Sequence, residues 1–352
     1  MNRGRIASGA PEVELVPFSS IPMVAIHWLW PRFLARGKLH VLAGAPGTGK
    51  TTLSMAIAAT ISCGGDWPDG SQSQQGKVLI WSGEDDPSDT LKPRLVAQGA
   101  RVEDCFFVGD VSTGDQPRCF DPAIDMPLLK TAAVRAGGIT LIIVDPISSA
   151  LTGQSHANAE VRRALQPFVD LAQEIGAAVL GITHLSKNSA GREPLERVTG
   201  SVAFGALPRI VLFAARRRNQ DGEENGRVLL LIKSNIGSDG GGISYEVEPH
   251  DVEGIETTRV SWGNAVEGSA QEILGGSDQP PIEENSRQHW IRQWLTQALS
   301  NGELLVTEIA AKAAEAGIGK KALENAKKAL GVGSRKIGKE GGWAWVPKPE
   351  DP

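Results

Sequence analysis

The sequence has few cysteines, no long apolar run and no strong excess of charge. None of its three cysteines, Cys63, Cys105 and Cys119, forms a CxxC pair, which argues against a disulfide framework or a cysteine zinc site and fits a reducing cytosol. No apolar run approaches the roughly 20 residues of a membrane-spanning helix, and the first residues lack the apolar stretch of a signal peptide. The net charge of -5 excludes a uniformly basic, DNA-coating protein but allows a local basic patch. We therefore expect a cytoplasmic protein without a membrane segment.

From Gly37 the chain alternates short apolar runs with segments of helical periodicity. Lys38–Ala43 and Ile139–Val144 are two of the apolar runs that indicate buried strands, and Gly49–Cys63 and Asn158–Ile175 have the pattern of helices. Several of these strands are apolar throughout, which is typical of a mainly parallel sheet with helices on both faces. The sequence therefore predicts an α/β fold.

A phosphate-binding motif is the strongest local signal. The run Gly44-Ala45-Pro46-Gly47-Thr48-Gly49-Lys50-Thr51 matches GxxxxGK[ST]. Its glycines let backbone N–H groups surround phosphates, and the following helix, which includes Thr52, directs its N-terminus at the anion. Lys50 brings a positive charge to the β and γ oxygens, and Thr51 offers a hydroxyl to Mg²⁺. An apolar strand precedes the loop and a helix follows it, so we expect these residues to bind a nucleotide.

A second element supplies a carboxylate for the same site. The run Thr140-Leu141-Ile142-Ile143-Val144-Asp145 carries Asp145 to the carboxyl end of an apolar strand. Such an aspartate completes the Mg²⁺ shell beside the threonine of a phosphate loop, so we assign Thr51 and Asp145 to the metal. The sequence contains no guanine-reading NKxD run, and we therefore expect ATP rather than GTP.

The order of these motifs resembles a known family. The acidic run Trp81-Ser82-Gly83-Glu84-Asp85-Asp86 and the following Leu91-Lys92-Pro93-Arg94-Leu95 resemble RecA-like P-loop ATPases, in particular plasmid RepA-type hexameric helicases of the DnaB superfamily and related phage AAA-family ATPases. The resemblance covers roughly residues 26–236. It implies that Glu84 polarises the attacking water and that His184 senses the γ-phosphate. We also expect Arg94 to stack on the adenine.

The resemblance further implies an arginine that acts across a subunit interface of a hexameric ring. Arg209 matches the RepA-type finger in its order along the chain. The chain departs from the DnaB pattern of a lysine and an arginine two residues apart, because Lys233 is followed by Asn235. The arginine in trans is therefore Arg209 or one of Arg216–Arg218, although the latter three are more typical of a solvated cluster before a hairpin.

A polar segment between residues 187 and 200 follows the strand that ends near His184. The resemblance places a mobile DNA-binding loop here, and it implies that Lys187, Arg192 and Arg197 contact the phosphates of single-stranded DNA. An ordinary surface loop is the alternative reading.

The C-terminal part has a different composition. Residues 266–286 are rich in Gly, Pro, Ser and acidic residues, which indicates a flexible linker. Residues 287–348 carry eleven Lys or Arg and five Asp or Glu, a net charge of +6. Three helices and a hairpin are predicted there, the pattern of a winged helix-turn-helix, with basic residues on the third helix and the wing. The predicted contacts to duplex DNA are Lys320, Lys321, Lys327, Lys328, Arg335 and Lys336. A winged helix that binds a protein is the alternative.

The sequence thus predicts an N-terminal segment (1–36), a RecA-like ATPase core (37–265), a linker (266–286) and a winged-helix domain (287–352). We expect an ATP-hydrolysing, hexameric motor on single-stranded DNA, namely a replicative helicase of a plasmid, phage or mobile element. A separately encoded primase or initiator is a further expected partner. Two alternatives stay open: an ATP-switched DNA-binding regulator of replication or transcription, and a recombination-type filament ATPase.

Overall fold

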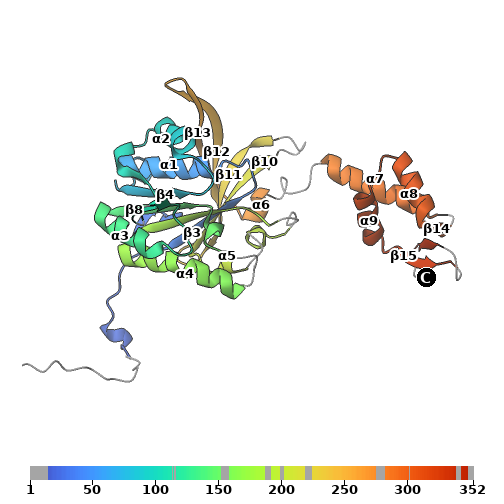
Figure 1. Ribbon diagram of the computed structural model, residues 1–352, viewed down its shortest axis with the longest axis horizontal. Helices are drawn as coiled ribbons and strands as arrows, with labels where there is room; N and C mark the ends of the chain where they lie inside the picture. The colour runs from blue at the N-terminus through green and yellow to red at the C-terminus, as the bar shows by residue number, and fades with distance from the viewer. Residues whose placement is uncertain are drawn as a thin grey trace, which may run out of the picture.

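A nine-stranded sheet forms the centre of the computed structural model (Figure 1), which describes residues 15–112, 114, 116–151, 158–186, 192–198, 202–218, 224–274, 282–300, 302–337 and 342–347. The strand order is β13-β12-β11-β10-β3-β9-β8-β4-β5. The parallel strands are β10 (Ile210–Arg218), β3 (Leu39–Gly44), β9 (Ala178–Thr183), β8 (Ile139–Asp145), β4 (Lys77–Ser82) and β5 (Cys105–Phe107). The antiparallel extension consists of β11 (Glu224–Ser234), β12 (Gly242–Val252) and β13 (Ile255–Val266).

Helices cover both faces of this sheet (Figure 1). The helices of one face are α1 (Lys50–Cys63) and α2 (Lys92–Ala97), and those of the other are α3 (Met126–Ala136), α4 (Asn158–Ile175) and α5 (Val202–Ala206). Two apolar cores result, because uniformly apolar strands present side chains to both faces. Leu53 of α1 lies in the first core and Phe168 of α4 in the second, and both are at most 1% exposed. The predicted α/β architecture with a mainly parallel sheet is confirmed.

Shorter elements connect these layers. They are the strands β6 (Val111–Ser112) and β7 (Pro117–Arg118), the 3₁₀ helices Phe18–Ser20, Val102–Asp104, Ile147–Ala150 and Pro194–Arg197, and a π-helical turn Pro87–Leu91. The π-helical turn leads directly into α2.

The core begins before residue 37. Strands β1 (Trp28–Trp30) and β2 (Leu34–Ala35) form a hairpin whose side chains enter the first apolar core. Trp30 is fully buried, stacks on Trp67 with ring centroids 4.6 Å apart, and meets the edge of Trp262 at 5.6 Å. The core also extends past residue 265, because α6 (Ala270–Leu274) places the buried Leu274 in the second core. The predicted boundaries at 36 and 265 therefore both cut through packed structure.

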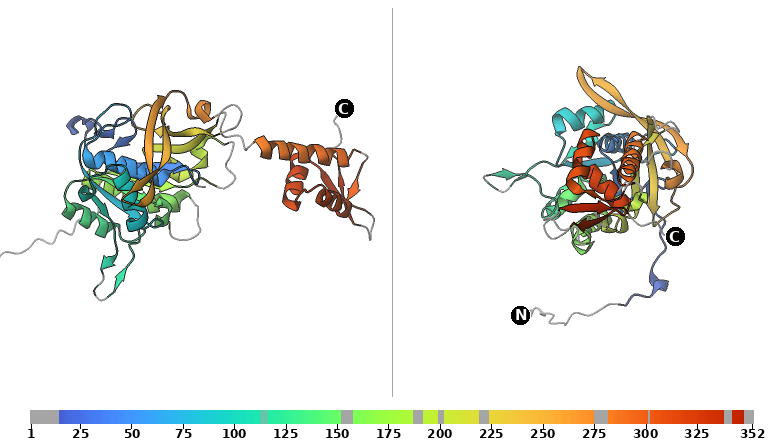
Figure 2. Two further views of the ribbon diagram at one scale, coloured as in Figure 1. Left: turned by 90° about the horizontal axis from the view of Figure 1, so that it is seen from above. Right: turned by 90° about the vertical axis from the view of Figure 1, so that its right-hand side faces the viewer.

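The β12–β13 hairpin extends well beyond the rest of the sheet (Figures 1 and 2). Its turn places Glu253 and Gly254 at φ of 54° and 86°. Most residues of β13 are exposed or half-buried, so the sequence lacks the alternation of apolar and polar residues that would have predicted this strand.

The C-terminal unit has an apolar core of its own. Its elements are α7 (Ile282–Ala298), β14 (Leu304–Leu305), α8 (Val306–Glu315), α9 (Lys320–Ala329), β15 (Gly333–Lys336) and β16 (Trp343–Val346), with β16 between β14 and β15. Leu295, Ile309, Leu323 and Trp345 are each at most 5% exposed and form the centre of this core. Within the described residues, no helix is both long and apolar enough to span a membrane.

Candidate active site

The candidate site lies where four neighbouring strands end. In the order β3-β9-β8-β4, the strands are parallel, so their carboxyl ends meet at one edge of the sheet. The phosphate loop follows β3, His184 follows β9, Asp145 ends β8 and Glu84 follows β4. Ligands of open α/β sheets bind at this edge. The fold thus brings together four elements that are up to about 140 residues apart in the chain.

The phosphate loop has the backbone that its sequence pattern predicts. Gly47 and Gly49 have φ of 75° and 85°, a region that side chains disfavour, and α1 begins directly after Gly49. A Cβ on Gly44 would lie 2.5 Å from the carbonyl oxygen of Ala214 on the adjacent strand, so this position has no room for a side chain. The loop therefore forms a tight cradle at a helix N-terminus, which suits a phosphate group.

Lys50 is almost fully buried within this loop. Its exposed fraction is 6%, and its Nζ donates to the carbonyl oxygens of Gly44 at 3.0 Å and Ala45 at 3.2 Å. Burial lowers the pKa of this ammonium group, because the charged form loses hydration, while Asp145 and Glu84 act in the opposite direction. A buried cation at the mouth of the cradle provides a site for an anion.

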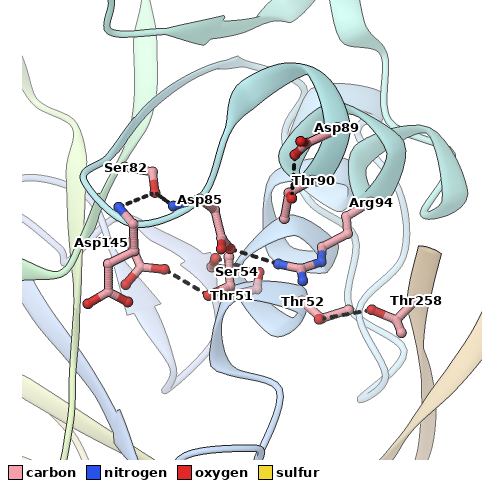
Figure 3. A network of polar contacts seen from close by, with 11 residues as sticks. Thr51, Thr52, Ser54, Ser82, Asp85, Asp89, Thr90, Arg94, Asp145 and Thr258 are labelled. Carbon is pink, nitrogen blue, oxygen red and sulfur yellow. Dashed lines mark hydrogen bonds and ion pairs between the residues drawn. The ribbon is translucent and has the colours of Figure 1, made fainter. Parts of the chain in front are cut away.

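Thr51 and Asp145 form the candidate magnesium site (Figure 3). The Thr51 hydroxyl donates to Oδ2 of Asp145 at 2.8 Å, and the carboxylate is 4% exposed. Burial raises the pKa of Asp145 to about 6, and the charges of Glu84 and Asp85 act in the same direction. A buried carboxylate next to two further acids and a hydroxyl offers the hard oxygen ligands that Mg²⁺ prefers. The residues present therefore fit this ion.

The raised pKa of Asp145 predicts a pH-dependent gain in stability for Asp145→Asn. The folded-state pKa of about 6 lies above the ordinary value of 3.8, so the carboxyl group's stabilising contribution is complete below the unfolded pKa. That contribution is lost as the pH rises through about 6. Above this pH the ionised carboxylate lowers the free energy of unfolding of the nucleotide-free protein by about 3 kcal/mol relative to the protonated group. Asparagine carries no such charge and can still accept the Thr51 hydrogen bond.

Chemical denaturation between pH 4 and pH 8, without nucleotide or magnesium, measures this effect. The free energy of unfolding of Asp145→Asn minus that of the wild type should increase with pH and level off above about pH 7. Asp110→Asn, at an exposed position, is the matched control and should show little change. A difference for Asp145→Asn that does not vary with pH would contradict the prediction.

Glu84 lies on a turn that the Ser82 hydroxyl holds. Oγ of Ser82 accepts hydrogen bonds from the backbone N–H groups of Glu84 at 3.3 Å and Asp85 at 2.9 Å. The Glu84 carboxylate is exposed, and its Oε1 lies 3.8 Å from Nε2 of His184. The two residues predicted to act on the γ-phosphate side therefore face each other across the ends of β4 and β9.

The neighbouring acidic residues and Arg94 have structural contacts (Figure 3). Arg94 donates from Nη1 to Oδ2 of Asp85 at 2.9 Å, and Asp86 accepts from the backbone N–H groups of Ser88 and Asp89 at the start of the next helical turn. The side-chain hydrogen bond from Ser88 lowers the pKa of the Asp86 carboxyl. The Arg94 guanidinium is thus held in an ion pair, and its predicted stacking on adenine stays a prediction.

Arg209 is exposed on the loop that enters β10. This loop is held by Lys233, whose Nζ donates to the carbonyl oxygens of Gly205, Ala206 and Pro208 at 2.6, 2.9 and 2.8 Å. Burial lowers the pKa of Lys233, and the nearby positive charge of Arg209 lowers it further. Lys233 is therefore committed to the backbone of this loop, and Arg209 is the cation that the loop presents to solvent.

Arg216 contacts the phosphate loop, which contradicts the reading of residues 216–218 as a purely solvated cluster. Its Nη2 donates to the Gly47 carbonyl at 3.0 Å, and its Nη1 donates to Glu224 at 2.6 Å. Tyr245 of β12 was not singled out in the sequence, yet its hydroxyl donates to the Thr48 carbonyl at 2.6 Å. Knowledge that β10 pairs with β3 would have been needed to predict that Arg216 contacts the phosphate loop. No local sequence pattern predicts the contact of Tyr245.

The residues predicted to contact DNA fall into three groups. Lys187 lies outside the described residues, and Arg192 is exposed. Arg197 differs from the prediction, because it is only 8% exposed and its guanidinium lies over the Phe213 ring, 5.2 Å from the centroid. Its charge packs against the core, which removes the solvent-facing position that a phosphate contact requires.

The third group lies on α9 and β15. Lys320, Lys321, Lys328 and Lys336 are exposed, whereas Lys327 is half-buried over the Trp345 ring and donates to Ser334. Arg335 pairs with Glu303 at 2.6 Å. Five of the six predicted contacts are therefore exposed, although Arg335 is paired with Glu303, and Lys327 is half-buried.

Comparison with known proteins agrees with this geometry. Residues 17–190 match the family model of an AAA domain, which includes the phosphate loop, Glu84, Asp145 and His184. The match ends before Arg209, Arg216 and the β12–β13 hairpin. The curated proteins contain no match to the chain. Over residues 17–190 the chain is therefore similar to an AAA domain, and its phosphate loop is that of a P-loop ATPase.

Proposed function

We propose that this protein hydrolyses ATP at the subunit interfaces of a hexameric ring and uses the energy to move on single-stranded DNA, as the replicative helicase of a plasmid, phage or mobile element. The observation that supports ATP hydrolysis is the convergence of Lys50, Thr51, Asp145 and Glu84 at one edge of the sheet. The ring and the DNA are supported by the positions of Arg209 and of the exposed lysines of α9.

In this proposal each residue of the site has one task. Lys50 and the loop amides bind the β- and γ-phosphates, and Thr51 and Asp145 would hold Mg²⁺, which offsets phosphate charge when bound. Glu84 orients a water molecule and accepts its proton as the water oxygen bonds to the γ-phosphorus and the bond to the β–γ bridging oxygen breaks. His184, 3.8 Å from Glu84, keeps that carboxylate directed at the water.

The place of Arg209 supports action between subunits. Arg209 precedes β10, and its backbone N–H donates to Leu39 at the amino end of β3, whereas the phosphate loop follows the carboxyl end of β3. About 16 Å of strand separates the two ends. An exposed arginine at the opposite edge of the sheet is thus suited to the nucleotide of a neighbouring copy rather than to its own.

The C-terminal unit supplies a basic surface for DNA in this proposal. Its three helices and three-stranded sheet have the element order of a winged helix, with α9 in the position of the recognition helix. Lys320, Lys321 and Lys328 are exposed on α9, which suits contacts to phosphates.

ATP hydrolysis with and without single-stranded DNA, over a range of protein concentrations, tests this function. We expect strong stimulation by DNA and a specific activity that rises cooperatively with protein concentration, because the site is shared between copies. Slow hydrolysis that responds to neither would support an ATP-switched regulator instead. Open filaments on DNA in electron micrographs, in place of closed rings, would support a recombination-type ATPase.

A further inference from the structure

The middle of the phosphate loop is anchored from outside the loop. The carbonyl oxygens of Gly44 and Ala45 accept hydrogen bonds from Lys50, a residue of the motif itself. The carbonyl oxygens of Gly47 and Thr48 accept hydrogen bonds from outside the motif. The donor to Gly47 is Arg216 of β10, and the donor to Thr48 is Tyr245 of β12. Both of these side chains belong to the antiparallel end of the sheet and lie beyond the matched AAA segment.

These two hydrogen bonds fix the direction of the loop amides. In a trans peptide unit the C=O group and the following N–H group point in opposite directions. A donor that holds the Gly47 carbonyl from outside therefore turns the Thr48 N–H inward, and the Thr48 carbonyl does the same for the Gly49 N–H. The Thr48 N–H indeed points across the loop, 3.4 Å from the Ala45 carbonyl oxygen. Inward-pointing amides are what binds a phosphate in such a loop.

The Tyr245 contact has the features of a fixed support. Tyr245 is the only tyrosine in the sequence, it is 1% exposed, and the edge of Trp262 packs against its ring at 6.2 Å. The next inward residue of the same strand, Val247, approaches the loop so closely that a Cβ on Gly49 would lie 2.7 Å from its Cγ2. The loop thus rests on β12 at two consecutive residues, Thr48 and Gly49.

We infer that Tyr245 and Arg216 are positioning residues of the phosphate loop: by holding the carbonyls of Thr48 and Gly47, they keep the loop amides directed at the nucleotide phosphates and so set nucleotide affinity. The inference rests on nucleotide binding by the loop and is independent of the proposed DNA motor. The two residues differ in one useful respect. Arg216 also brings a positive charge, which Glu224 partly offsets, whereas Tyr245 is neutral and acts through orientation alone.

Tyr245→Phe isolates this orientation, because it removes one hydroxyl and leaves the ring. We expect the KM for ATP and the Kd for both ADP and ATP to rise about fivefold to tenfold, with kcat at saturating ATP changed less than twofold. Ser244→Ala is the matched control, since it removes the hydroxyl of the neighbouring residue, which donates to the Asn264 carbonyl oxygen of the same hairpin. Its KM and Kd values should equal those of the wild type.

The outcomes separate this inference from a general loss of stability. A lower thermal midpoint of Tyr245→Phe with unchanged KM and Kd would overturn the inference, because the hydroxyl would then support the fold alone. Should Tyr245→Phe fail to fold, Arg216→Gln provides the second test, since Arg216 is exposed and its loss should again raise the Kd for ATP at least fivefold. Wild-type protein that binds no ATP would instead refute the nucleotide site itself.

Discussion

Lys50→Ala is expected to lose ATP binding and hydrolysis together, with the affinity for ATP reduced about 100-fold or more. Lys50 is the buried cation of the phosphate loop, and a hydrogen bond between charged groups in such a setting is among the strongest single contacts to a ligand. Equilibrium titration with ATP and with ADP, each with magnesium, measures the loss. Both nucleotides should bind weakly, because Lys50 reaches phosphates that they share.

The loss should not come from unfolding. Burial lowers the pKa of the Lys50 ammonium, so removal of this charge relieves a desolvation cost that offsets the loss of its hydrogen bonds to the loop. Lys130→Ala is the matched control, because Lys130 is exposed on α3 and pairs with Glu174 on α4. Wild-type affinity in Lys50→Ala, or equal losses in both variants, would refute the assignment of the phosphate site.

Glu84→Gln is expected to bind ATP with wild-type affinity and to hydrolyse it about 10²-fold to 10⁴-fold more slowly. The glutamine side chain has the size of glutamate and occupies the same position on the turn that Ser82 holds. Its amide group cannot accept a proton from water. Glu84 is exposed beside His184, whereas the buried Lys50 binds the phosphates in the ground state. Its loss should therefore lower kcat and leave the Kd for ATP within about threefold.

Single-turnover hydrolysis of preloaded ATP separates these two quantities. Glu103→Gln replaces an exposed glutamate before β5 and should hydrolyse ATP at the wild-type rate. If Glu84→Gln retained its single-turnover rate, the general base would have to be another group, and Asp145 and Asp85 would be the nearest carboxylates to examine.

The parts of the site that the sequence predicted are those formed by short segments. Lys50 and Thr51 follow a glycine-rich turn between a strand and a helix, and Asp145 follows four apolar residues, so each position depends on its immediate neighbours. Parallel pairing then brings the strand ends together without further information. For the same reason the apolar strands correctly predicted a mainly parallel sheet with helices on both faces.

The parts that the sequence did not predict depend on contacts between distant segments. Trp30 was assigned to the N-terminal segment and Trp262 to the ATPase core, but they meet in one aromatic cluster although they are 232 residues apart. Arg216 looked like a solvated residue because three arginines in a row are usually exposed, yet it donates to the carbonyl oxygen of Gly47 in the phosphate loop that follows the neighbouring strand β3. Arg197 looked like a loop cation, yet the Phe213 ring of β10 covers it.

The inferred role of Tyr245 links nucleotide binding to the long β12–β13 hairpin, which reaches outside the site. One end of the hairpin holds the phosphate loop through Tyr245, and Thr258 of β13 lies 3.3 Å from Thr52 of α1, while the other end extends away from the core (Figure 1). Binding free energies at two such linked places are reciprocal. A molecule that binds the outer part of the hairpin and displaces β12 would change the affinity of the protein for ATP by some factor. ATP would then change the affinity of the protein for that molecule by the same factor.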